Sequence, residues 1–401
     1  MSLRWKPRHC LLFILFALVF LLYVKIFRRS EKQASSEPSR EKTLITKPYR
    51  GGYCAVLNYW EPEDKWRDSI TYVVHSTMPF VDYLGQLAYW WDGPISVAIY
   101  VPTPDFNAGS RSYYNREFMD ALSKLESLSS VKKTGKVGIH LLFDRPLNCR
   151  NFTFSIDDLK TDMRYLDGLY RGEAHIANYP CQALRNIARF EMKTRLFVMS
   201  DIENIPSENY VKRVLPLANE MITAGEDKVV LVHRRFEVDV KQRIPTNKTD
   251  LKKLYDQNLA VEFHKEFYAA GHSIPHLERW FEIPEDMSAA SVFEFVNYTN
   301  GEWEPQFVGD TTQVPFYDES FPYPHRGQTQ MAYEACRAGF KFAVLNDVFT
   351  VHPGIKRNAS RAEQEGVQRA ESFYYNIVNS FRQRMDTLYP KTKYKCGFFK
   401  N

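Results

Sequence analysis

The sequence predicts an α/β domain built on a parallel sheet. From about residue 68, short apolar segments typical of strands alternate with longer segments typical of helices. The strand segments are apolar at nearly every position, as expected for strands that helices cover on both faces. The hydrophobic and charged fractions, 44% and 25%, are those of a globular protein rather than a disordered chain.

The predicted elements follow one another in regular order. In such open sheets, ligands bind at the carboxyl ends of the strands. The expected strands are residues 70–75, 95–101, 137–143, 196–199 and 229–233, and the expected helices are residues 80–91, 115–128 and 183–193.

The N-terminus carries an uninterrupted apolar run, CLLFILFALVFLLYV, at residues 10–24. Its length is near the low end of what spans a bilayer. No small-residue cleavage motif follows it closely, which argues against a removed signal peptide. A helix that is apolar on every side, beside a polar tract, has nothing to pack against as a core helix. We therefore predict a cytosolic tail at 1–9 and an uncleaved transmembrane signal anchor at 10–27.

A polar stretch follows this segment. Residues 30–50 are rich in Ser, Lys and Glu and nearly free of aromatic residues, which is typical of a flexible linker. We predict a stem at 28–67 and a single folded domain at 68–401. Basic residues flank the apolar run on both sides, so the charge bias alone does not fix the orientation of the anchor.

The positive charge of the chain is concentrated at its N-terminus. Residues 1–50 hold eleven Lys/Arg and three acidic residues, a net +8, so the total of +5 leaves about −3 for residues 51–401. A nucleic-acid-binding protein normally carries its basic patch on the folded domain. We therefore expect no nucleic-acid partner.

Glycosylation sequons and cysteines bear on the compartment. The folded part holds four Asn-x-Ser/Thr sequons, which favour a lumenal location. The five cysteines beyond the apolar run allow two disulfides and one free thiol, with the pairing left open. The sequons are Asn151, Asn247, Asn297 and Asn358, and the cysteines are Cys54, Cys149, Cys181, Cys336 and Cys396.

The segment LFVMSDIENIP, residues 196–206, indicates the chemistry. An apolar strand runs into Asp201 and Glu203, and alternate side chains of an extended segment share one side. Carboxylate oxygens are the ligands that Mg²⁺ and Mn²⁺ prefer, and such an ion neutralises the charge that develops on a departing diphosphate. An exposed loop with two solvated acids is the alternative interpretation.

Several segments resemble glycosyltransferase family 49, the family of the β-1,4-glucuronyltransferase of the dystroglycan pathway and of the second catalytic domain of the LARGE enzymes. YPCQALRNIARFEMKTRLFVMSDIENIPSE, residues 179–208, resembles the donor-site region of that family. The similarity extends from about residue 68 to the C-terminus. It includes WDGPISVAIYV at 91–101, VPFYDESF at 314–321 and AGFKFAVLNDVFTVHPGIK at 338–356.

This resemblance implies a GT-A (Rossmann-like) fold, an inverting mechanism and a UDP-sugar donor bound with Mn²⁺ or Mg²⁺. Asp201 and Glu203 match the D-x-D motif of the family, and His352 in VHPG matches its third metal ligand. Arg185 and Asn186 match a residue pair before the metal strand and are expected to contact the nucleotide or the metal-side loop. A helix packed on the sheet with a solvated Arg185 is the alternative.

Two departures from the family pattern leave the donor open between glucuronic acid and GlcNAc. Glu203 stands where the family has Asp, and the loop PYPHRGQTQ at 322–330 replaces a glycine-aromatic stretch with Asn. These departures also allow a second hypothesis, in which the chain is an inactive relative that serves as a glycan-binding or partner protein in the Golgi.

An inverting transfer needs a general base that deprotonates the acceptor hydroxyl. The sequence offers Asp318, in the family-like FYDESF, and Asp310, beside Gly309 in a predicted loop. Each also suits a structural role as a cap. The whole reading places a single-pass type II protein in the Golgi membrane with its catalytic domain in the lumen, acting on a nucleotide-sugar and a glycan acceptor. A homodimer or a complex with other Golgi enzymes is left open.

Overall fold

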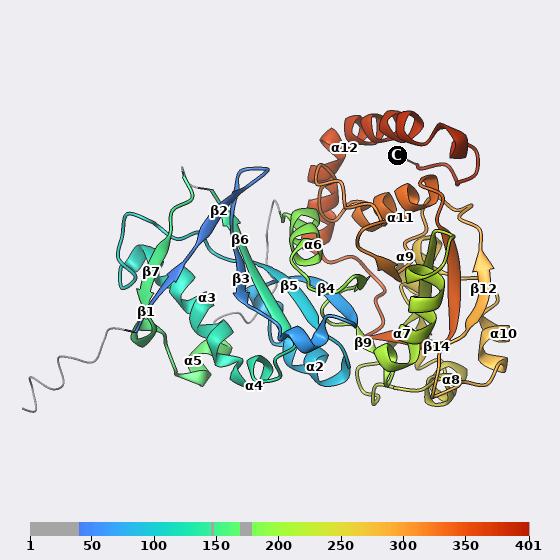
Figure 1. Cartoon of the computed structure of the whole chain (residues 1–401), viewed down its shortest axis with the longest axis horizontal. Coiled ribbons are helices and arrows are strands. Elements are labelled where there is room, and N and C mark those ends of the chain that lie inside the picture. Colours follow the sequence, from blue (N-terminus) through green and yellow to red (C-terminus); the bar gives the residue numbers. More distant parts are fainter. Residues whose placement is uncertain (1–39, 146–147, 169–178, 401) are drawn as a thin grey trace, which may run out of the picture.

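The computed structural model describes residues 40–145, 148–168 and 179–400, and a mixed sheet of 12 strands runs through them (Figure 1). The strand order is β12-β14-β10-β13-β8-β4-β5-β6-β3-β2, with β11 beside β10 and β9 beside β14. A separate pair is formed by β1 and β7. The strands are β1 Glu41–Leu44, β2 Thr46–Tyr49, β3 Tyr53–Trp60, β4 Ile70–Thr77, β5 Ile95–Tyr100, β6 Val137–Asp144, β7 Phe152–Ser155, β8 Leu196–Met199, β9 Ile205–Pro206, β10 Val229–Val238, β11 Ala260–Glu262, β12 Val292–Val296, β13 Phe307–Asp310 and β14 Lys341–Pro353.

Helices cover both faces of the sheet. One apolar cluster joins one face to α2, α3 and α7, and a second joins the other face to α6, α11 and α12. In Figure 1, α12 lies along the top of the molecule, above α11. The helices are α2 Tyr83–Trp90, α3 Arg116–Ser127, α4 Ser129–Lys132, α5 Met163–Gly168, α6 Cys181–Phe190, α7 Tyr210–Ala218, α8 Lys248–Asp256, α9 Lys265–His272, α10 Leu277–Glu282, α11 Gly327–Arg337 and α12 Arg361–Leu388, and a π-helix at Asn219–Thr223 continues α7.

The centre of the sheet is parallel, as predicted, but the sheet as a whole is mixed. Neighbouring strands β8, β4, β5 and β6 all run in the same direction. β13 runs the opposite way between β8 and β10, and β14 is parallel to β10. The carboxyl ends of β8, β10 and β14 therefore meet at the same edge of the sheet.

The five predicted strands and three predicted helices are all present, with shifts at their ends. The largest shift is in β10, which was expected to stop at His233 and continues to Val238. The charged residues Arg234, Arg235 and Glu237 are not typical of a strand, but their side chains are buried in the fold. The two arginines pair with carboxylates, and Glu237 accepts a hydrogen bond from the Lys356 N–H.

The predicted stem boundary at residue 67 is wrong. β2 and β3, at Thr46–Tyr49 and Tyr53–Trp60, belong to the main sheet, and β3 pairs antiparallel with β6. The segment YCAVLNYW is hydrophobic at every position except Asn58, as expected for a buried strand, but the polar stretch before it obscured this signal. The folded domain thus includes residues from about Glu41 onward.

Two disulfides join segments far apart in sequence. Cys54 in β3 is bonded to Cys149, and Cys336 at the end of α11 is bonded to Cys396, while Cys181 is a free, buried thiol. Two disulfides and one free thiol are what the sequence allowed. The two bonds tie the N-terminal hairpin and the C-terminal tail to the domain.

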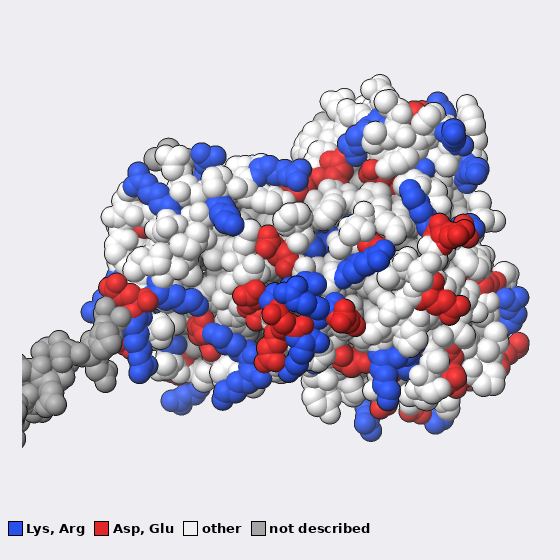
Figure 2. All heavy atoms as spheres, in the orientation of Figure 1, with Lys and Arg blue, Asp and Glu red and all other residues white. Residues whose placement is uncertain are grey.

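The predicted anchor at 10–27 lies outside the described residues. Within the part of the chain that the structure describes, no helix has the length and apolar character needed to cross a bilayer. On the face shown in Figure 2, basic and acidic side chains are intermixed and no single basic patch forms.

Candidate active site

The acidic pair lies at the carboxyl end of β8. Directly after Glu203 the chain forms β9, which pairs antiparallel with the end of β14 so that Ile205 lies opposite Val351. His352 is the next residue of β14, and its Nε2 lies 3.8 Å from Glu203 Oε1. The pairing of β9 with β14 therefore brings the predicted third ligand to the acidic motif.

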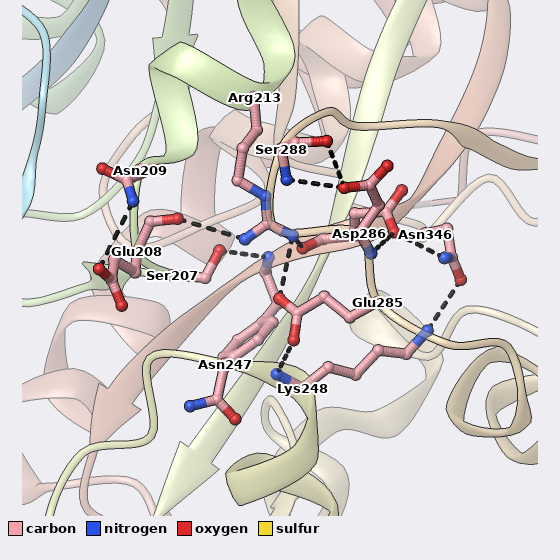
Figure 3. Close-up of polar contacts among 12 residues, drawn as sticks. Ser207, Glu208, Asn209, Arg213, Asn247, Lys248, Glu285, Asp286, Ser288 and Asn346 are labelled. Atoms are coloured by element: carbon pink, nitrogen blue, oxygen red, sulfur yellow. Dashed lines mark hydrogen bonds and ion pairs between the residues drawn. The ribbon is translucent and has the colours of Figure 1, made fainter.

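A buried polar network holds this pairing in register (Figure 3). Ser207 Oγ accepts a hydrogen bond from the backbone N–H of Phe349 at 3.2 Å. The guanidinium of Arg213 donates to the carbonyl oxygens of Glu208 and Asp347, and it lies 2.9 Å from Glu285 Oε1. One side chain of α7 thus joins the segment after β9 to the middle of β14.

Glu203 and His352 form the part of the site that fits a metal ion. His352 Nδ1 lies 3.3 Å from the carbonyl oxygen of Gly354, which orients Nε2 toward Glu203. Carboxylate oxygen and imidazole nitrogen are both donors that suit Mn²⁺. Across the described ranges, however, no group of three or more His, Cys, Asp and Glu side chains is arranged to hold an ion. The donor chemistry fits the predicted cation, whereas Asp201 is engaged elsewhere.

Asp201 is held by two arginines. Arg235 Nη2 donates to Asp201 Oδ2 at 2.9 Å, and Arg185 Nη2 lies 3.9 Å from Oδ1. Burial raises the pKa of Asp201, but the charges of Arg235 and Arg185 outweigh this effect and lower the pKa to about 2. The carboxylate is therefore ionised throughout the physiological range.

A cavity of about 700 Å³ opens beside Asp201, within the usual size range of small-molecule sites. Arg185, Arg235 and Arg326 line it. The Nε atoms of Arg185 and Arg235 and Nη1 of Arg326 are buried and have no hydrogen-bond partner among the residues that the structure describes. Buried donors are normally satisfied, so these three predict an anionic ligand such as a diphosphate.

Aromatic and histidine side chains line the same cavity. The Arg235 guanidinium carbon lies over the Phe263 ring, 3.6 Å from the centroid of that ring. The Phe263 ring also stacks on the His264 ring. His264 Nδ1 lies 3.2 Å from His272 Nε2. Burial, reinforced by the charge of Arg235, lowers the pKa of His264 to about 3 and that of His272 well below its usual value. Both rings are therefore neutral at physiological pH.

Arg185 and Asn186 are adjacent in α6, but the structure gives them different surroundings. Arg185 is buried and lines the cavity, so the alternative of a solvated arginine is wrong. Asn186 Nδ2 donates to the Tyr317 carbonyl oxygen at 2.9 Å, and Asn186 Oδ1 accepts from the Tyr317 N–H at 2.9 Å. With its amide committed to that loop, Asn186 does not contact the large cavity.

The structure places neither predicted base beside the cavity. Asp310 pairs with Leu196, at the start of β8 and the opposite end from Asp201, and its Oδ2 lies 2.6 Å from Arg195 Nε. Asp318 accepts hydrogen bonds from Ser320 and lies 2.8 Å from Arg384 Nη1. Both carboxylates therefore act as structural caps and ion-pair partners. The sequence did not reveal this, because it does not show which end of the sheet each segment reaches.

Sequence reasoning missed Arg235 and Glu304, which both line the cavity. Arg235 lies just past the end of the predicted strand at 229–233. Glu304, in the segment GEWEPQF, follows no predicted element, so no periodicity marked it. The signal available for Arg235 was the run RRFEV directly after an apolar strand, in which two basic residues and one acid would each need a buried partner.

The four sequons lie at the surface or close to it. Asn151, Asn297 and Asn358 are exposed. Asn247 is half-buried and caps α8, with its Oδ1 accepting from the Asp250 N–H at 2.8 Å. The surface position leaves glycosylation at the three exposed sites sterically open, and it stays a prediction.

Sequence comparisons identify the family. The sequence profile of a family described as "Glycosyl-transferase for dystroglycan" matches residues 69–390. The protein is therefore an enzyme of the glycosyltransferase class. More narrowly, it belongs to glycosyltransferase family 49, as the motifs around Asp201 and His352 indicated.

Curated relatives point the same way. The mouse protein named beta-1,4-glucuronyltransferase 1 is 24% identical over 349 residues, covering 82% of this chain and 78% of its own length. The zebrafish (Danio rerio) protein of the same name is 24% identical over 335 residues, covering 80% and 74%. Mouse "Xylosyl- and glucuronyltransferase LARGE2" is 21% identical over 294 residues, covering 73% of this chain and 35% of the relative.

Some solved structures match at low sequence identity. S. aureus TarS 1–349 in complex with UDP aligns with a TM-score of 0.35 and 10% identity, covering 71% of this chain and 60% of that one. GalNAc-T7 with UDP, GalNAc and Mn²⁺ aligns with a TM-score of 0.38 and 12% identity, covering 85% and 56%. At these scores the likeness carries no conclusion about function.

Proposed function

We propose that this protein transfers glucuronic acid from UDP-glucuronic acid to a glycan acceptor, with inversion at the anomeric carbon, on a GT-A-type domain. Glucuronic acid takes precedence over GlcNAc because the relatives that match over most of their length are named glucuronyltransferases. The observation that carries the proposal is the cavity beside Asp201, where three arginines present N–H groups that no described residue accepts.

The arginines match the charge of the donor. A UDP-sugar brings a diphosphate, and UDP-glucuronic acid adds a carboxylate. Arg185 and Arg235 lie beside Asp201, and Arg326 lines the same cavity. Bidentate guanidinium contacts suit both phosphate and carboxylate groups. These residues would bind and orient the donor.

The proposed cation is Mn²⁺ or Mg²⁺. Glu203 and His352 would hold it, with Asp201 as the neighbouring carboxylate. When bound, such an ion neutralises charge on the departing diphosphate. Glu203, in the loop before β9, reaches His352 with its longer side chain. A glutamate at this position can therefore serve as a metal ligand in place of the aspartate of the family.

The cellular setting is also proposed. We place the domain in the Golgi lumen behind a single-pass type II anchor at residues 10–27. The apolar run and the four sequons support this placement. No observation in the fold favours the alternative of an inactive glycan-binding relative.

The test is a donor screen on the full-length protein in detergent. UDP release is measured with UDP-glucuronic acid, UDP-GlcNAc, UDP-glucose and UDP-xylose, a panel of glycoside acceptors, and Mn²⁺ or EDTA. We expect acceptor-dependent release of UDP from UDP-glucuronic acid that EDTA abolishes. Asp201→Asn is expected to lower kcat by about 100-fold or more, since it removes the charge that pairs with the arginines.

Asp256→Asn, on the exposed face of α8, is the matched control, and it should behave as wild type. Absence of turnover with every donor would refute the proposed activity. Full turnover in EDTA would refute the metal, and full turnover of Asp201→Asn would remove Asp201 from the site.

A further inference from the structure

We propose that Glu304 is the general base that takes the proton from the acceptor hydroxyl. This assignment rests on the proposed function, because it requires a glycosyl transfer in the cavity beside Asp201. It replaces Asp310 and Asp318, which the fold places away from that cavity.

Four carboxylates of the described residues line the cavity, and three have other roles. Asp201 is paired with two arginines. Glu363 caps the start of α12 and lies 2.5 Å from Lys356 Nζ. Glu371 is exposed on α12. Glu304 remains as a largely buried carboxylate that forms no ion pair with a Lys or Arg among the described residues, and the neutral His272 has its Nε2 4.0 Å from Glu304 Oε2.

The surroundings of Glu304 orient one oxygen and leave the other available. Glu304 Oε1 accepts a hydrogen bond from Thr329 Oγ1 at 2.6 Å, and the Glu304 N–H donates to the Gly271 carbonyl oxygen at 2.7 Å. Among the described residues, none donates a hydrogen bond to Oε2. A base needs this arrangement, in which a third group fixes the side chain while a lone pair faces the substrate.

The electrostatic environment suits the role. Burial raises the pKa of Glu304, and this effect outweighs the Thr329 hydrogen bond and the charges of Arg235 and Arg185, which lower it; Asp201 raises it. The other titratable groups that face it are His272, Tyr268, Tyr298 and Tyr374. A carboxylate with a pKa shifted toward the working pH is the better proton acceptor.

The step balances with the residues and substrates named. The acceptor O–H bond breaks and its proton moves to Glu304 Oε2. The acceptor oxygen forms a bond to the anomeric carbon, while the bond from that carbon to the diphosphate oxygen breaks and its electron pair leaves with UDP. The resulting carboxylic acid then releases its proton to solvent.

The test compares Glu304→Gln, Glu304→Asp and wild type in the full-length protein. Glutamine keeps an oxygen that accepts from Thr329 but cannot take a proton. We expect Glu304→Gln to lower kcat by about 100-fold or more. The Kd for UDP-glucuronic acid, measured by calorimetry, should change by less than about threefold. Glu304→Asp should recover part of the activity.

The pH profile separates a base from a structural group. Because the base must be unprotonated, wild-type kcat/KM should fall on the acid side through the raised pKa of Glu304, and this limb should be absent in Glu304→Gln. Glu220→Gln, an exposed residue after α7, is the control and should keep the wild-type profile.

Three results would overturn the assignment: a Glu304→Gln variant with more than about a tenth of wild-type kcat, a loss of donor affinity as large as the loss of kcat, or an unchanged acid limb. Each of these needs an active wild-type protein and leaves the proposed function intact. An inactive wild-type protein would refute the proposed function, and the base assignment with it.

Discussion

At the scale of single residues, α6 shows how neighbours in sequence separate in space. Arg185 and Asn186 look like one binding pair in the sequence. An α-helix turns about 100° per residue, so adjacent side chains leave it in different directions. Arg185 lines the cavity, whereas Asn186 closes two hydrogen bonds with the backbone of Tyr317. The first is a candidate ligand contact and the second supports the loop at 315–319.

This distinction gives the first prediction. Asn186→Ala leaves a buried N–H and a buried C=O of Tyr317 without partners, so we expect a loss of about 1–3 kcal/mol in the free energy of unfolding. Urea denaturation measures the loss, and the KM for the donor should stay unchanged. A stable variant with a raised donor KM would instead restore Asn186 to the nucleotide site.

At the scale of elements, the short strand β9 determines whether a site forms. It has two residues, and without its pairing to β14 the Glu203 carboxylate and the His352 ring would not meet. Arg213 supports this pairing from α7, because its guanidinium reaches the backbone on both sides and Glu285. The ion pair is buried, with Arg213 at 0% and Glu285 at 6% side-chain exposure.

The second prediction concerns this ion pair. Arg213→Met leaves the buried Glu285 carboxylate without its guanidinium, and breaking such a pair costs about 3–5 kcal/mol. Thermal and urea unfolding measure the loss. The double variant Arg213→Met/Glu285→Gln should recover part of it, because the uncompensated charge is gone. A double variant no more stable than Arg213→Met would show that backbone contacts, and not the charge pair, carry the effect.

At the scale of the whole molecule, the sheet buries several histidines as neutral rings. Burial lowers the pKa of His75, His140 and His233 to about 3 in each case. His75 Nδ1 lies 2.6 Å from the Tyr179 hydroxyl, and His233 Nδ1 lies 2.8 Å from that of Tyr210. These three rings therefore stay neutral in the folded protein at pH values at which they bind a proton in the unfolded chain.

The third prediction is the resulting pH dependence. Below about pH 6.5 the unfolded chain binds protons that these three rings refuse in the folded state, so stability falls as pH falls toward 3. These three groups contribute on the order of 4 kcal/mol per pH unit to the slope, and His264 and His272 add to it in the same direction. Urea denaturation between pH 7 and 5 measures it. His140→Gln should reduce the slope by about 1.4 kcal/mol per pH unit, and an unchanged slope would refute the assignment for that ring.

Much of the fold was predictable because its signals are local. The apolar strands β4, β5, β6 and β8 carry their own pattern, and Asp201 and Glu203 stand directly after one of them. The later half of β10 was missed because its charged residues are typical of a loop in the sequence, and only the fold shows the partners that allow them to be buried. The hairpin of β2 and β3 was missed because the polar stretch before it led to the prediction of a flexible stem.

The sequence by itself determined the class of protein, through motifs whose residues lie within a few positions of one another, and it determined the strand that presents Asp201. Only the tertiary structure decided which distant residues join them. His352 and Arg235 reach the site, and Asp310 does not, because strand direction and register set the edge of the sheet at which each residue lies. Register depends on pairing between segments far apart in the chain, and no local pattern contains it.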